Sequence, residues 1–188
     1  MSREGCLAAA IENLMVTRAA AQLEEVFRAH HARVLKAAYR VTGSMADAED
    51  VAQSVFLRLA RGGIDRDRIS HLESYLHRSA INAALDLIRS RGHREIVPVE
   101  TADELQSNTS LSPERAHSSM EIRKWLRLEL AKLSPRAAEM FALRYFEELE
   151  NPEIARMMNT SQAVVAVILH RTRARLKKKL RGFMKGAI

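Results

Sequence analysis

Cysteine, glycine and proline are scarce in this chain, and their scarcity excludes several classes of protein and of site. A single cysteine among 188 residues excludes an internal disulfide framework and a cysteine-based zinc site. The chain has only seven glycines and four prolines, so residues that favour turns and loops are few. No run of about 18 uninterrupted apolar residues occurs, so we expect no membrane span. The apolar patch "CLAAAI" lies between Glu4 and Glu12 and makes a poor signal peptide, so we expect a cytoplasmic protein.

Catalytic patterns are also missing. The sequence has no Gly-rich phosphate loop and no nucleophile motif, and its seven histidines are scattered without the spacing of a metal site. We therefore expect no enzymatic activity, no cofactor and no metal. A hydrophobic content of 47% nevertheless suffices to fill a core, which argues against wholesale disorder.

The positive charge concentrates near the C-terminus. Residues 119–188 hold 15 Lys and Arg and 7 Asp and Glu, so their net charge is +8, whereas the net charge of the whole chain is +7. Residues 95–118 hold one basic residue against five acidic ones, and residues 170–188 hold no acid. Basic blocks of this kind commonly bind polyanions, although a solvated helix face has the same composition.

Helical periodicity runs through nearly every ordered stretch, and alternating strand patterns are absent, which predicts an all-α fold. The first predicted domain, residues 21–91, holds three main helices. The first ends at Gly43, the second starts with a cap at Ser44, and the third starts with the capping box of Ser70 and Glu73. The apolar residues expected to be buried are Val26, Phe27, Val34, Leu35 and Ala38, then Ala48, Val51, Ala52, Val55 and Leu59, then Leu72, Tyr75, Leu76, Ala80, Ala83 and Leu87.

Residues 92–118 lose this periodicity and are predicted to be a flexible linker. Fully extended, such a linker reaches roughly 90 Å at ~3.3–3.6 Å per residue, so it does not fix the spacing of the flanking domains. Residues 1–20 form an N-terminal extension, whose "AAAIENLMV" is either a short helix or a frayed end.

The second predicted domain, residues 119–188, is also small and helical. Its first helix carries Ile122, Trp125, Leu126, Leu130 and Leu133. Ser134 followed by Pro135 starts a helix to about Leu149, and Asn151 followed by Pro152 starts a short one. Asn159 breaks the short helix, and Ser161 caps a long basic one. A short helix, a turn and a longer basic helix make a helix-turn-helix arrangement.

Two separated stretches resemble one family. "ADAEDVAQSVFLRLA" with "LESYLHRSAINAALDLIRSR" resembles the second conserved region of bacterial sigma factors. "LSPRAAEMFALRYFEELENPEIARMMNTSQAVVAVILHRTRARL" resembles their fourth, and the missing middle region is typical of the extracytoplasmic-function group. The resemblance implies a factor that binds core RNA polymerase through the beta-prime clamp helices and beta flap, recognises promoter DNA and helps melt it. It also leaves open a further partner, an anti-sigma factor.

The resemblance assigns polymerase contacts to the second helix. Asp50 and Gln53 match family positions, whereas Asp47 and Glu49 have an alternative role in complementing the helix dipole. The full set of candidate polymerase-binding residues is Asp47, Glu49, Asp50, Gln53 and Arg58.

The third helix carries the candidate contacts to the minus-ten element. Asn82 matches the family position that helps hold a flipped base, and an amide suits this role because it both donates and accepts hydrogen bonds. Arginines in the same region suit backbone phosphates. The candidate set is Arg78, Asn82, Arg89 and Arg91.

The last helix departs from the family's pattern. The family usually has Thr, Lys, Ser and Arg at its first exposed positions, which read the minus-thirty-five element. This chain has apolar residues there, and they cannot form bidentate contacts to guanine. The candidate minus-thirty-five residues are Ser161, Val164, Ala166, Val167, Ile168, His170, Arg171, Arg173 and Arg175.

Three explanations of this apolar face stay open. In the first, the helix reads an AT-rich or weakly specified element through thymine methyls and charge. In the second, the face packs on protein, which is an anti-sigma factor, another subunit or the first domain. In the third, the domain has lost base reading, and specificity comes from the minus-ten end. Two other classes compete with a sigma factor: a helix-turn-helix regulator that acts without polymerase, and a sigma-like protein that sequesters a regulator. The first of these leaves the "DAEDVAQ" and "LESYLHRSAINAALDLIR" segments unexplained.

Overall fold

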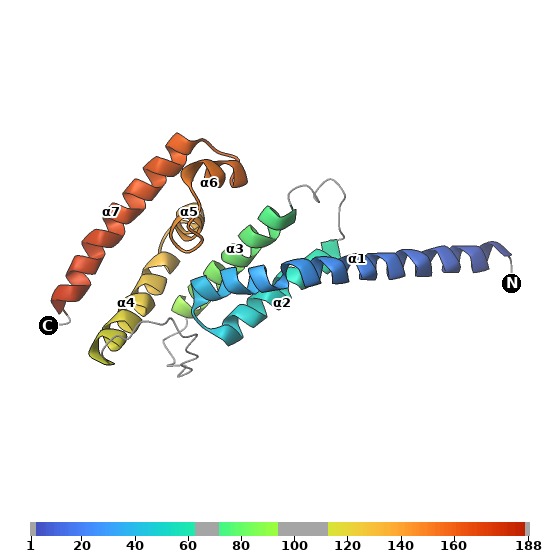
Figure 1. Ribbon diagram of the computed structural model, residues 1–188, viewed down its shortest axis with the longest axis horizontal. Coiled ribbons are helices and arrows are strands. Elements are labelled where there is room, and N and C mark those ends of the chain that lie inside the picture. Colours follow the sequence, from blue (N-terminus) through green and yellow to red (C-terminus); the bar gives the residue numbers. More distant parts are fainter. Residues whose placement is uncertain (1–2, 63–71, 94–112, 187–188) are drawn as a thin grey trace.

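The computed structural model describes residues 3–62, 72–93 and 113–186, and every element within these ranges is an α-helix. The expected all-α fold is therefore confirmed, with helices grouped into two bundles (Figure 1). In chain order the helices are α1 (Arg3–Thr42), α2 (Met45–Gly62), α3 (Leu72–His93), α4 (Pro113–Ala131), α5 (Pro135–Tyr145), α6 (Asn151–Met157) and α7 (Gln162–Gly186).

Helices α1, α2 and α3 form the first bundle around the predicted apolar stripes. All five stripe residues of α2 are buried, as the helical period requires. Two predicted core residues are instead exposed: Phe27 and Tyr75 each keep 43% of their surface. Phe27 contacts Phe56 edge-on, with ring centroids 4.8 Å apart, and it also contacts the ring of His31 at 4.5 Å. Tyr75 lies beside the face that Leu72 and Leu76 already fill.

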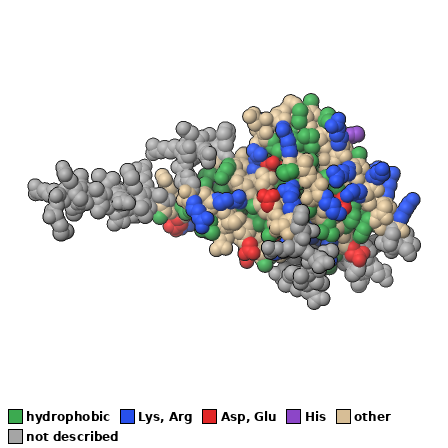
Figure 2. All heavy atoms as spheres, turned by 180° about the vertical axis from the view of Figure 1, so that it is seen from behind, with side chains coloured by type: hydrophobic (Ala, Val, Ile, Leu, Met, Phe, Trp, Pro, Cys, Tyr) green, Lys and Arg blue, Asp and Glu red, His purple; other side chains and the backbone are tan. Residues whose placement is uncertain are grey.

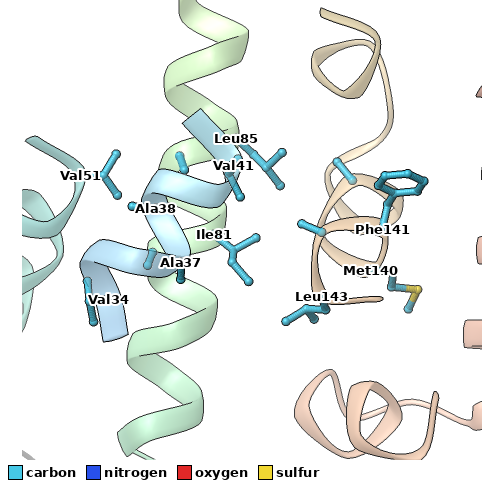
Figure 3. Close-up of a cluster of buried hydrophobic side chains, with 14 of the residues drawn as sticks. Val34, Ala37, Ala38, Val41, Val51, Ile81, Leu85, Met140, Phe141 and Leu143 are labelled. Atoms are coloured by element: carbon cyan, nitrogen blue, oxygen red, sulfur yellow. The ribbon is translucent and has the colours of Figure 1, made fainter. Parts of the chain in front are cut away.

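Helix α3 is buried on two sides, which the sequence stripe did not predict. It contacts α1 and α2 on one side, and α4 and α5 of the second bundle on the other. Ile81, Ala84 and Leu85 are therefore fully buried, although they lie outside the predicted stripe. Ile81 and Leu85 lie between the α1 side chains and the side chains of α5 (Figure 3). One continuous core thus joins the two bundles. The sequence predicted a linker that does not fix the spacing of the two domains, but direct packing of the bundles fixes it.

The second bundle comprises α4 to α7, and three of its helix ends differ from the prediction. Helix α4 begins at Pro113, within the predicted linker, and α5 ends at Tyr145 rather than near Leu149. The turn after α5 includes Glu148 with φ of 58°, a left-handed conformation that ends the helix. Helix α6 is capped by Glu150 rather than Asn151, because Glu150 and Glu153 form a reciprocal capping box.

The helix-turn-helix arrangement is confirmed in α6 and α7. Asn159 adopts φ of 48° in the turn between them. Ser161 then caps α7, where its hydroxyl accepts a hydrogen bond of 3.3 Å from the Val164 amide. The buried face of α7 consists of Val165, Leu169, Thr172 and Leu176, at the helical spacing expected from the sequence.

The predicted N-terminal extension is continuous with the first helix. Helix α1 runs as helix from Arg3 onward and projects beyond the bundle at its N-terminal end (Figure 1). The predicted cap at Ser70 lies outside the described residues. The helices that the structure describes are each too polar or too short to cross a bilayer.

Candidate nucleic-acid interface

The two bundles meet through charged side chains that flank the shared core. Arg78 of α3 donates from Nε to Glu139 Oε1 at 2.7 Å, and from Nη1 to the Met157 carbonyl at 2.7 Å. The Glu139 side chain is only 8% exposed, so its charge depends on this arginine for compensation. Arg78, predicted as a DNA contact, is thus directed at the second bundle.

A second group of charges surrounds Glu147, which follows α5. Its Oε2 lies 3.0 Å from Arg40 Nη1 and 3.0 Å from His77 Nε2. Burial raises the pKa of this carboxyl, but His77 and Arg40 beside it outweigh burial and hold the pKa below its ordinary value. The group borders a cavity of about 330 Å³ between the bundles, lined by Arg33, Lys36, Arg40, Glu73, Ser74, His77, Glu147, Leu149 and Met157.

The third contact places an arginine on the turn between α1 and α2. Arg127 of α4 donates from Nε to the Val41 carbonyl at 3.2 Å. Its guanidinium occupies the space that a Cβ on Gly43 would need, and Gly43 has φ of 70°. Burial, assisted by the charge of Arg123, lowers the pKa of Arg127. Glycine is therefore favoured at residue 43 by its left-handed backbone conformation, and a Cβ there would displace the guanidinium of Arg127.

The predicted polymerase-binding residues divide into two groups. Glu49, Asp50, Gln53 and Arg58 are exposed on α2. Asp47 is buried instead, and its carboxylate accepts two hydrogen bonds from the guanidinium of Arg91, at 2.5 and 2.6 Å. Asp47 thus has a structural contact within the first bundle, between α2 and α3.

Sequence reasoning missed one exposed apolar residue on the same surface. Leu57 is 48% exposed and lies four residues after Gln53 and seven after Asp50, on one side of α2. Its position outside the stripe of Ala48, Val51, Ala52, Val55 and Leu59 was the available signal. Leu57 therefore adds apolar surface to the side of α2 that carries the exposed Asp50 and Gln53.

The predicted minus-ten residues on α3 do not form one cluster. Asn82 is half-buried, and Arg89 pairs with Asp86 at 2.7 Å. Arg91 pairs with Asp47, and Arg78 pairs with Glu139 across the bundle interface. In this arrangement three of the four side chains are engaged in contacts within the protein.

The predicted minus-thirty-five residues on α7 are mostly exposed. Val164 keeps 39% of its surface and Val167 keeps 48%, so the first bundle does not cover them. Ile168 differs, because it is half-buried against the core. The other exposed members are Ser161, Ala166, His170, Arg171, Arg173 and Arg175.

Basic side chains extend the surface of α7 toward its C-terminal end. Helix α7 contains no acidic residue, and Lys179 is joined to Glu129 of α4 at 2.5 Å. On the face drawn in Figure 2, Lys and Arg gather toward the end of the molecule that lies away from the projecting N-terminal helix. This charge suits a polyanion, whereas the part of the chain that the structure describes holds no cluster of His, Cys, Asp and Glu suited to a metal ion.

Comparison with known families matches both bundles. The Sigma-70 region 2 family matches residues 26–94, and the Sigma-70 region 4 family matches residues 123–176. The chain is 30% identical to the ECF RNA polymerase sigma factor SigW of Bacillus subtilis over 158 residues, which cover 79% of this chain and 83% of SigW.

Two further relatives are also named as RNA polymerase sigma factors. The chain is 27% identical to RNA polymerase sigma factor YlaC of Bacillus subtilis, covering 84% of this chain and 91% of YlaC. It is 30% identical to the ECF RNA polymerase sigma factor SigE of Mycolicibacterium smegmatis, covering 84% of this chain but 61% of SigE.

Proposed function

The chain belongs to the extracytoplasmic-function group of the sigma-70 family, and on this basis we propose that it directs promoter-specific initiation by core RNA polymerase. The observation that carries the proposal is the pairing of a region 2 bundle with a region 4 helix-turn-helix in one chain. A conventional regulator needs only the second bundle, so the matched first bundle favours a factor that works with polymerase. Such a factor acts without chemistry of its own, in the cytoplasm with the polymerase.

The exposed side of α2 is the proposed contact with the beta-prime clamp helices. Asp50, Gln53 and Leu57 combine charge, hydrogen-bonding capacity and apolar surface on one side of the helix, and Glu49 and Arg58 flank them. Asp47 supports this surface from behind through its pair with Arg91. The second bundle then has the beta flap as its proposed contact on polymerase.

The minus-ten contact is proposed for α3, with Asn82 as the residue that holds a flipped base. Arg78 adds a phosphate contact only when it leaves Glu139 and the Met157 carbonyl, because both of its hydrogen bonds point into the second bundle. A phosphate contact by Arg78 therefore requires the two bundles to separate at this point. Arg89 would reach phosphate next to its partner Asp86.

Two measurements, polymerase binding and promoter opening, distinguish a sigma factor from a conventional regulator and from a protein that only sequesters a regulator. We expect Asp50→Ala with Gln53→Ala to weaken binding to core polymerase, while Glu25→Ala, on exposed α1 surface, serves as the matched control. We expect Asn82→Ala to slow open-complex formation, followed by permanganate reactivity of unpaired thymines, without loss of polymerase binding. A protein that binds duplex DNA alone and ignores polymerase would instead be a conventional regulator.

A further inference from the structure

The exposed apolar surface at the start of α7 has a definite position on the helix. Val164, Val167 and Arg171 are spaced by three and four residues, so they share a side that Ala174 and Lys178 continue. Val165 and Leu169 occupy the buried side. The outward side of α7 is therefore apolar over its first two turns and basic farther along.

This order matches the way a recognition helix meets DNA. The N-terminal residues of such a helix approach base edges in the major groove, while basic residues along it hold phosphates. Val164 and Val167 lie near the N-terminus of α7, where a recognition helix approaches base edges. Arg171 and Lys178 lie farther along, where basic residues hold phosphates. Because α7 contains no acidic residue, no side chain on it would repel the phosphates of a DNA duplex.

The chemistry of valine limits what this helix can read. Valine has no hydrogen-bonding group, so it makes no bidentate contact to guanine or adenine. Thymine alone among the unmodified bases presents a methyl group in the major groove, where apolar side chains contact it. Ile168 takes little part, because it is half-buried against the core.

We propose that Val164 and Val167 are specificity-determining residues that read thymine methyl groups in the upstream promoter element. This inference rests on the proposed function, and it narrows that function to an element recognised by methyl contact rather than by guanine hydrogen bonds. Arg171 and the basic residues after it hold the backbone without choosing a sequence.

Replacing thymine by uracil tests this directly, because the two bases differ only in the methyl group. Holoenzyme reconstituted from the full chain and core polymerase selects from a randomised duplex library, which is made once with thymidine and once with deoxyuridine. We expect upstream thymines to be enriched in the first library only. In single selected sites, each contacted methyl should contribute about fourfold in affinity, the value of burying about one methylene.

Variants assign the effect to the helix. We expect Val164→Ala with Val167→Ala to bring the thymine-to-uracil affinity ratio close to one, and alanine is compatible with the helix. Met184→Ala is the matched control, because Met184 is an apolar residue of α7 with 49% exposure at its other end, and it should retain the ratio.

Four results would overturn the inference. Equal selection from both libraries would exclude methyl reading. A thymine-to-uracil affinity ratio that is unchanged in the double valine variant would assign methyl reading to other residues. A selected minus-ten motif without upstream thymines would refute the inference and leave the sigma-factor function intact, as expected if a protein partner covers the valines. Selection of no sequence at all would refute both.

Discussion

Removing Arg78 should weaken the docking of the second bundle on the first. Arg78→Ala deletes both hydrogen bonds of 2.7 Å that join α3 to Glu139 and to the Met157 carbonyl. It leaves the Glu139 carboxylate, which is 8% exposed, without its partner. An uncompensated buried charge is the main source of destabilisation when such a pair is broken.

The expected magnitude follows from the burial of the two partners. Breaking a fully buried pair costs about 3–5 kcal/mol, but the Arg78 side chain is 34% exposed, and water can enter the vacated space. We therefore expect a loss of roughly 2–3 kcal/mol in the free energy of docking, or about 30- to 150-fold in the docking equilibrium. Glu139→Gln keeps an acceptor for Arg78 and should lose only about 1 kcal/mol.

Single-molecule energy transfer measures docking without requiring a partner. Dyes on Glu25→Cys and Lys178→Cys, in a Cys6→Ser background, report the distance between α1 and α7. Arg78→Ala should shift molecules toward low transfer efficiency, whereas Arg28→Ala, which removes an exposed pair within α1, should not. An unchanged efficiency distribution for Arg78→Ala would refute the reasoning.

Two further predictions concern the same interface. Gly43→Ala should destabilise the protein by about 1–2 kcal/mol in chemical denaturation, because φ is 70° and Arg127 fills the Cβ position. Gly182→Ala, with nothing within 4 Å of its Cβ position, should be neutral or stabilising by up to about 1 kcal/mol, and equal effects at the two sites would contradict this account. The lowered pKa of Glu147 means that its contribution to docking is present above the ordinary carboxyl pKa of about 4.3 and is lost as pH falls through the lowered pKa. Glu147→Gln should therefore reduce the acid dependence of energy transfer, and an identical pH profile would argue against this role.

Local patterns in the sequence predicted those features that depend on neighbouring residues. The stripe of α2 and the buried side of α7 follow from the helical period, and Ser44 and Ser161 cap as their types suggest. The Asn151 cap was wrong because a reciprocal pair, Glu150 with Glu153, satisfies more of the free backbone amides.

Features that depend on distant residues were not predictable in this way. Arg78 and Glu139 are 61 positions apart, and no periodicity links them. The burial of Ile81 and Leu85 likewise results from α5 packing on α3, which a single-helix pattern does not encode. The site residues on α2, α3 and α7 remain predictions from family resemblance, to which the structure adds their exposure and their partners.

Run-off transcription tests the central claim most directly. Purified core RNA polymerase is combined with this protein on a pool of promoter fragments, and transcripts are mapped with and without the protein. We expect discrete transcripts that depend on the protein, start downstream of a shared minus-ten motif, and weaken with Asn82→Ala. The absence of such transcripts, despite demonstrable binding to core polymerase, would contradict the claim that this chain initiates transcription.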